Sequence, residues 1–91
     1  MTFAVEVGEV EKHLVEYKFN QLIGILTIKV DKKQVIRATR LINEPLSEVF
    51  QFTVGEMVKL QVRIEKQRKQ LLGHRNCLYV DNRLTRVFEG L

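Results

Sequence analysis

Two stretches decide the fold: VEVGEVEKHLVEYKF (residues 5–19) and FQFTVGEMVKLQVRIEK (residues 50–66). Each stretch places Val-Gly-Glu between two runs in which apolar and polar residues alternate. Alternation with a period of two sends successive side chains to opposite faces of a strand. The two stretches therefore predict two similar hairpins within one chain.

The likeness extends beyond these stretches. Lys12 aligns with Lys59 at the same offset, and after an insertion of three residues the Val-Asp pair at 30–31 falls on the Val-Asp pair at 80–81. Each copy reads as strand, tight turn at glycine, long strand, loop ending in glycine, strand, turn at aspartate, strand. The identical residues are few, but the shared order of elements predicts an internal duplication.

Four runs carry the clearest strand pattern, because apolar side chains occupy one face and β-branched and aromatic residues are frequent. The shared apolar faces comprise Val15, Tyr17 and Phe19; Leu26, Ile28 and Val30; Phe50, Phe52 and Val54; and Val58, Leu60, Val62 and Ile64. In the last run a helical spacing of apolar residues competes with the alternation, but Gln67 interrupts it. We predict a strand over residues 57–65 and leave residues 66–72 open to a helical turn.

The segments between the runs contain residues typical of turns. Gly8 and Gly55 can adopt the positive φ that a tight hairpin or bulge requires. The Asp-Asn pair at 81–82 suits a two-residue hairpin, since both residue types tolerate left-handed backbone, and the Asp-Lys pair at 31–32 is a weaker form of the same signal. Residues 43–45 (Asn-Glu-Pro) are predicted to link the copies, because proline has no amide for a ladder.

Together these patterns predict an all-β protein, namely an antiparallel β-sandwich or barrel of about eight strands built from two similar four-strand units. We assign one domain to residues 1–91, with internal units at about 1–42 and 46–91. A chain of 91 residues can bury a single core without disulfides or metals.

Composition bounds the class of protein. Apolar residues make up 45% of the chain, as in globular domains, and the single cysteine cannot form an internal disulfide. No apolar run reaches the roughly 20 residues that span a bilayer, and the acidic N-terminal stretch does not resemble a signal peptide. We therefore expect a soluble, cytoplasmic protein with no membrane insertion.

The layout resembles the Fas apoptosis inhibitory molecule family, with a strand closing on Val-Gly, a long alternating strand and a hydrophobic-x-Val-Asp hairpin, twice over. The matching segments are LTIKVDKKQVIRATRLI (26–42), FQFTVGEMVKLQVRIEKQ (50–67) and CLYVDNRL (77–84). The family tends to place glycine after the hairpin aspartate, where this chain has Lys32 and Asn82, and it is richer in tryptophan, which this chain lacks. The resemblance implies a compact antiparallel sandwich, a cytosolic setting, no enzymatic activity and binding of other proteins.

No motif for catalysis, a cofactor or a metal occurs in the sequence. His13 and Glu16 are three residues apart, so in a strand they point to opposite faces, and we expect both His13 and His74 at the surface. Cys77 has cationic neighbours, which favour a reactive thiol. In a strand, however, its side chain shares a face with that of Tyr79, which favours Cys77 as a small core residue. We predict no enzyme, no catalytic residue, no cofactor and no metal site.

The basic stretch at residues 59–75 is the one charge feature with a possible binding role. It holds six bases against the single acid Glu65: Lys59, Arg63, Lys66, Arg68, Lys69 and Arg75. On an exposed strand face such a patch can neutralise a phosphate backbone, but Tyr79 is the only aromatic residue nearby for base stacking. A solvated face that blocks edge-to-edge aggregation is the simpler interpretation.

The sequence thus predicts a non-enzymatic β-sandwich that acts as a protein-interaction module, through an exposed sheet edge or as a homo-oligomer. The alternative is a weak nucleic-acid or polyanion binder that uses the basic segment 59–75. A third hypothesis is a thiol-dependent sensor or enzyme centred on Cys77.

Overall fold

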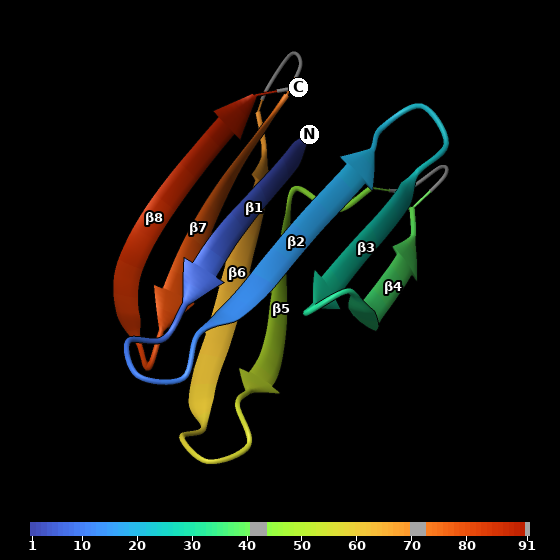
Figure 1. Ribbon diagram of the computed structural model, residues 1–91. Helices are drawn as coiled ribbons and strands as arrows, with labels where there is room; N and C mark the ends of the chain where they lie inside the picture. Colours follow the sequence, from blue (N-terminus) through green and yellow to red (C-terminus); the bar gives the residue numbers. More distant parts are fainter. Residues whose placement is uncertain (41–43, 70–72, 91) are drawn as a thin grey trace.

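The computed structural model describes residues 1–40, 44–69 and 73–90, which form eight strands in two antiparallel sheets (Figure 1). The strands are β1 (Thr2–Val7), β2 (His13–Asn20), β3 (Ile25–Val30), β4 (Lys33–Thr39), β5 (Ser47–Val54), β6 (Leu60–Arg68), β7 (His74–Val80) and β8 (Arg83–Gly90). One sheet has the order β1-β2-β3-β4 and the other β5-β6-β7-β8. The sheets do not close into a barrel, so each predicted four-strand unit forms one layer of a sandwich.

The core lies between the inner faces of the two sheets. The alternation of apolar and polar residues along each strand turns the apolar side chains toward this space. The buried hydrophobic residues are Phe3, Val5, Val7, Val15, Tyr17, Phe19, Leu26, Ile28, Phe50, Val54, Val62, Ile64 and Leu78. The four apolar faces predicted from the sequence are confirmed in all but one of their members, Val58.

The duplication is visible in matching hydrogen bonds. The backbone N–H of Asp31 donates to the carbonyl oxygen of Leu14 (2.9 Å), and that of Asp81 donates to Gln61 (2.8 Å). In return, the Oδ1 atom of each aspartate accepts from the N–H of the same residue, at 2.9 Å in both units. All four residues of the two hairpin turns have positive φ, which confirms the prediction for 31–32 and 81–82. A register shift lies close to each turn at aligned positions, between residues 28 and 29 and between residues 78 and 79.

The two Val-Gly-Glu turns are also equivalent. Gly8 has φ 104° and Gly55 has φ 101°, as predicted. A Cβ atom would lie 2.1 Å from the carbonyl oxygen of Glu11 at the first position and 2.0 Å from that of Val58 at the second. Only glycine fits these turns, because both the backbone conformation and the close approach exclude a side chain.

Each sheet has two edge strands. Of these, β4 and β8, here called the outer strands, lie at opposite sides of the molecule (Figure 1). β8 lies beyond β1, and β4 lies beyond β5. Most residues of both strands are exposed on both faces, unlike those of β2 or β6. The two sheets are therefore offset, and each leaves part of the other uncovered.

One strand boundary differs from the prediction. β6 begins at Leu60, so residues 57–59 belong to the turn and Val58 is 49% exposed. β6 continues to Arg68, which excludes a helical turn over residues 66–68. Residues 70–72 of that prediction, and Asn43 of the predicted link, lie outside the described residues.

Candidate interaction surface

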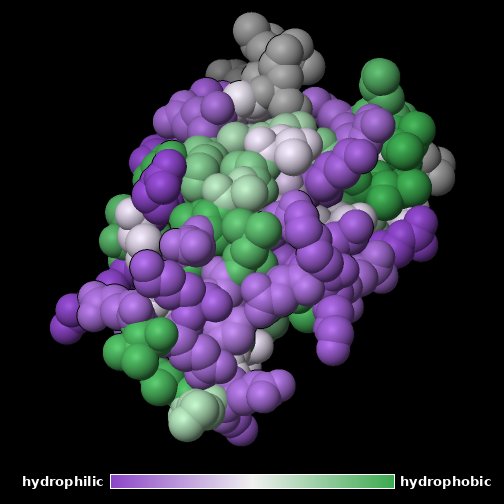
Figure 2. All heavy atoms as spheres, in the orientation of Figure 1, coloured by the Kyte–Doolittle hydropathy of each residue, from purple (hydrophilic) through white to green (hydrophobic). Residues whose placement is uncertain are grey.

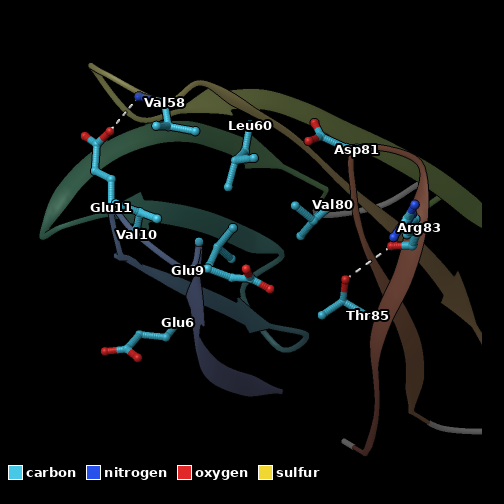
Figure 3. Close-up of a pocket in the computed structure, with 12 residues that line it drawn as sticks. Glu6, Glu9, Val10, Glu11, Val58, Leu60, Val80, Asp81, Arg83 and Thr85 are labelled. Carbon is cyan, nitrogen blue, oxygen red and sulfur yellow. Dashed lines mark hydrogen bonds between the residues drawn. The ribbon is translucent and has the colours of Figure 1, made fainter.

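A groove opens at one end of the sandwich, between the end of β1 and the start of β8 (Figure 3). Its volume is about 650 Å³. Val7, Leu60 and Val80 line it with apolar surface, because the alternation of their strands turns these side chains inward. We call this feature the β1–β8 groove.

The rim of the β1–β8 groove is charged. Figure 3 shows Glu6 and Glu9 on the β1 side and Arg83 on the β8 side. Within residues 1–40, 44–69 and 73–90, none of these three side chains has an ion-pair partner. Asp81 adds a further carboxylate, of which Oδ1 accepts the backbone N–H of Gln61. The groove is therefore acidic, although the chain as a whole has a net charge of +4.

The open edge of β1 leads into the groove. The N-terminal amine of Met1 donates to the carbonyl of Phe19, and the N–H of Phe19 donates to the carbonyl of Met1, each at 2.8 Å. In an antiparallel ladder such hydrogen-bonded pairs alternate with pairs whose backbone groups point away from the partner strand. The N–H and C=O groups of Thr2, Ala4 and Glu6 therefore point away from β2, toward the open edge.

The inner face of β8 beyond β1 is only partly covered. Phe88 stacks on Phe3 of β1 with ring centroids 3.9 Å apart, which places the two strands against each other. Nearer the start of β8, the side chains of Arg83, Thr85 and Arg86 are exposed. A strand added beside β1 would lie over this part of β8.

Two exposed apolar side chains project from the same end of the molecule. Val10 is 92% exposed and Met57 is 91% exposed, and the duplication aligns these two positions. Figure 2 shows a hydrophobic group at the lower tip of the molecule, below a mostly hydrophilic front face, where Figure 1 places the β1–β2 and β5–β6 turns. Apolar side chains this exposed contribute nothing to the core, so they are available to a partner.

A carboxylate from one turn holds the other turn in place. Glu11 accepts three backbone hydrogen bonds, from the N–H groups of Glu56 (2.9 Å), Met57 (3.1 Å) and Val58 (2.9 Å). The bonds from Glu56 and Val58 are the main cause that lowers the pKa of Glu11 to about 2. The tip is therefore ordered before any partner binds, which reduces the entropy lost on binding.

His13 lies between two carboxylates and is half-buried, so the expectation of a surface histidine is wrong for this residue. Its Nδ1 atom lies 2.5 Å from Oδ2 of Asp31, and its Nε2 atom lies 3.0 Å from Oε2 of Glu11. The hydrogen bond to Asp31 raises the pKa of His13 and lowers the pKa of Asp31. A protonated ring donates a hydrogen bond to Asp31 and forms an ion pair with Glu11, and so stabilises the turn.

The six bases of the predicted polyanion site do not form one patch. Lys66 is 1% exposed, so the prediction that it faces solvent is wrong: β6 continues past Glu65, and the alternation turns Lys66 inward. Lys59 precedes β6 and Lys69 follows it, which separates them by roughly 30 Å along the strand.

Two of the remaining bases are engaged within the protein. Arg63 contacts Oε2 of Glu65 (3.0 Å) and lies 4.2 Å from the centre of the Tyr79 ring. Lys69 contacts Oε2 of Glu89 at 2.6 Å. Arg68 and Arg75 are exposed at one end of the sheet. The basic segment therefore offers few free cations in any one place.

A buried polar cluster at the opposite end of the sandwich was not predicted from the sequence. The Nζ atom of Lys66 lies 2.7 Å from Oε2 of Glu44 and 3.5 Å from Oε1 of Glu48. Glu44 also contacts Nε2 of His74 at 2.6 Å, and Glu48 contacts Arg40 at 2.8 Å. His74 has no exposed surface, so the expectation that it lies at the surface is wrong.

Burial would raise the pKa of Glu44, but the hydrogen bonds from Lys66 and His74 outweigh it and hold the pKa below its ordinary value. The cluster joins the segment between the two units to the second sheet. Continuing the period of two from Ile64 to Lys66, and back from Leu78 to His74, would have predicted these inward polar positions.

Cys77 is half-buried on the outer face of the second sheet, opposite Glu65 of β6 and Val87 of β8. The expectation that it fills the core is therefore wrong. It does share its face with Tyr79, as predicted, but that face is the outer one.

The described residues contain no group of three His, Cys, Asp or Glu side chains that could hold a metal ion. Among the same residues no helix is long and apolar enough to cross a membrane. Comparisons with protein-family models, with curated proteins and with solved structures gave no match. The family resemblance noted in the sequence therefore stays a prediction.

Proposed function

We propose that this protein is a non-enzymatic protein-interaction module that accepts an extended segment of a partner protein as an added strand beside β1. One observation carries the proposal: the backbone groups of Thr2, Ala4 and Glu6 face the open edge of β1, and this edge ends at the acidic β1–β8 groove. The added strand would hydrogen-bond to β1 and cover the exposed part of β8.

The energetics of strand addition suit this surface. Main-chain hydrogen bonds give affinity, with a net contribution of about 0.5–1.5 kcal/mol each, and pockets for alternate side chains give specificity. The apolar surface of Val7, Leu60 and Val80 provides such a pocket. The exposed side chains of Val10 and Met57 provide further apolar contact beside it.

Polyanion binding, the alternative, has less support. Lys66 is buried, and Arg63 and Lys69 each contact a glutamate, so few bases remain to neutralise phosphates. A loss of oligonucleotide binding on raising the salt concentration would be needed to restore this alternative.

The proposal is tested with peptides selected from a random peptide display library on the immobilised full chain. Hydrogen exchange of the complex should show new protection of the amides of Thr2, Ala4 and Glu6. Ala4→Pro should weaken binding tenfold or more, because it removes an outward N–H and its ring enters the place of the added strand. Proline is tolerated at such edge positions, so the fold should persist.

Gln51→Pro is the matched control. Gln51 aligns with Ala4. The N–H of Arg68 donates to the carbonyl of Leu46, so in this ladder the backbone N–H and C=O of Gln51 point away from β6, toward the open edge of β5. This variant should bind selected peptides as the wild type does. Failure to select a peptide, or protection of amides elsewhere than β1, would overturn the proposal even if Ala4→Pro did not fold.

A further inference from the structure

We infer that the β1–β8 groove selects a partner segment in which apolar residues alternate with lysine or arginine. This inference rests on the proposed function, since it assumes that the segment is added to β1 as a strand. It concerns the chemistry of the segment, which strand addition alone leaves open.

The two faces of β1 determine the alternation. Val5 and Val7 point inward and are buried, whereas Ala4 and Glu6 point outward and are exposed. Residues opposite each other on adjacent strands share a face, so the partner residue beside Val7 points inward and its neighbours point outward. An apolar side chain in the inward position meets Leu60 and Val80.

The outward positions meet acids. Glu6 shares the outer face, and Glu9 stands at the end of the groove with no ion-pair partner among the described residues. A lysine or arginine on either side of the apolar residue would face these carboxylates. An aspartate or glutamate at the same positions would face like charge, which is unfavourable for directly opposed residues.

The charge of the protein also favours a foreign segment over a second copy of this chain. Each copy has a net charge of +4, so copies repel. The outer strands carry arginines, Arg37 on β4 and Arg83 and Arg86 on β8, as edges that resist self-pairing do.

The test uses three capped peptides of eight residues with valine at alternate positions and lysine, threonine or glutamate at the others. We expect the lysine peptide to bind roughly threefold to tenfold more tightly than the threonine peptide, and the glutamate peptide to bind more weakly than either. The lysine preference should shrink as salt is raised, because these carboxylates are exposed to solvent.

The double variant Glu6→Gln/Glu9→Gln should abolish the lysine preference and leave the threonine peptide bound as before. Glu56→Gln is the matched control, because Glu56 aligns with Glu9 but lies in the other turn; it should keep the preference.

Each failure has a distinct signature. Equal binding of the lysine and threonine peptides, with the amides of Thr2, Ala4 and Glu6 protected, would overturn the charge preference and leave strand addition standing. Absence of protection with all three peptides would overturn the proposed function itself. Sedimentation that shows self-association of the protein alone, lost in Ala4→Pro, would make a second copy the occupant and overturn the inference.

Discussion

The two Val-Gly-Glu turn ends share a backbone frame but differ in the side chains that fill it. Glu11 and His13 of the first unit align with Val58 and Leu60 of the second. Glu11 holds the neighbouring turn by hydrogen bonds, and His13 contacts both Glu11 and Asp31. The apolar pair lines the β1–β8 groove. Glu11 lines the same groove. The shared residues maintain the fold, and the exchanged ones give the groove an apolar wall beside a carboxylate that holds the neighbouring turn.

A second exchange distinguishes the two units at the opposite end. Phe19 of β2 aligns with Lys66 of β6, and the two side chains meet, with the Lys66 ammonium 4.0 Å from the centre of the Phe19 ring. The first unit thus supplies an apolar ring where the second supplies a buried charge. The second unit needs Glu44, from the segment between the units, to balance that charge.

The largest expected effect comes from removing the buried charge. Lys66→Ala should lower the free energy of unfolding by about 3–5 kcal/mol, because it removes the ammonium from a buried site and leaves Glu44 with His74 alone and Glu48 with Arg40 alone. Chemical denaturation measures this loss. Lys69→Ala is the matched control, since Lys69 lies 2.6 Å from Glu89 but is 44% exposed, and its loss should be far smaller. Equal losses would show that burial is not what distinguishes these two lysines.

The shared frame is tested by Gly8→Ala and Gly55→Ala. Each should destabilise the protein by about 1–3 kcal/mol, because the added Cβ meets a backbone carbonyl and the positive φ is strained for alanine. The two losses should be similar if the turns are equivalent. Gly90→Ala provides the control, since a Cβ there meets nothing closer than 3.9 Å. A large loss at one of the turn glycines alone would contradict the equivalence.

The exchanged polar residues are tested by the dependence of stability on pH. The pKa of Glu11 is about 2 in the folded protein against an ordinary 4.5, so its contribution is complete above about pH 4.5 and is lost as pH falls toward 2. The pKa of His13 is raised above 6.5, so its contribution is complete below pH 6.5 and is lost as pH rises through the raised value. Stability supplied by this turn should therefore be greatest between about pH 4.5 and 6.5.

Glu11→Gln should reduce the loss of stability on the acid side and keep the loss on the alkaline side, because the hydrogen bond to Asp31 that raises the pKa of His13 remains. Thermal unfolding at a series of pH values would show this. Glu56→Gln is the control, because the side chain of Glu56, in the aligned turn, accepts none of these hydrogen bonds. This variant should leave the pH profile of stability unchanged. An unaltered profile in Glu11→Gln would mean that other carboxylates control the acid response.

The sequence predicted the frame well and the sites poorly, for a physical reason. Alternation and turn chemistry are local signals, so they predicted the inward faces, the glycine turns and the Asp31 and Asp81 hairpins. Alternation extended to Lys66 and His74 would have placed both side chains inward. Their partners, and the contact of Glu11 with residues 56–58, come from other parts of the chain, and no local pattern encodes such contacts. A stronger repeat was available: residues 21–24 (Gln-Leu-Ile-Gly) recur as 70–73 (Gln-Leu-Leu-Gly).

The smallest expected effect lies on the outer face of the second sheet. Cys77 aligns with Thr27, and both are half-buried on the outer face of their sheets. Cys77→Thr should therefore change the free energy of unfolding by no more than about 0.5 kcal/mol, as substitutions away from the core do. The native thiol should also react with a thiol reagent at neutral pH without prior unfolding, since part of its surface is exposed. A loss of several kcal/mol in Cys77→Thr, or labelling that requires denaturant, would mean that Cys77 is packed in a way that its counterpart Thr27 is not.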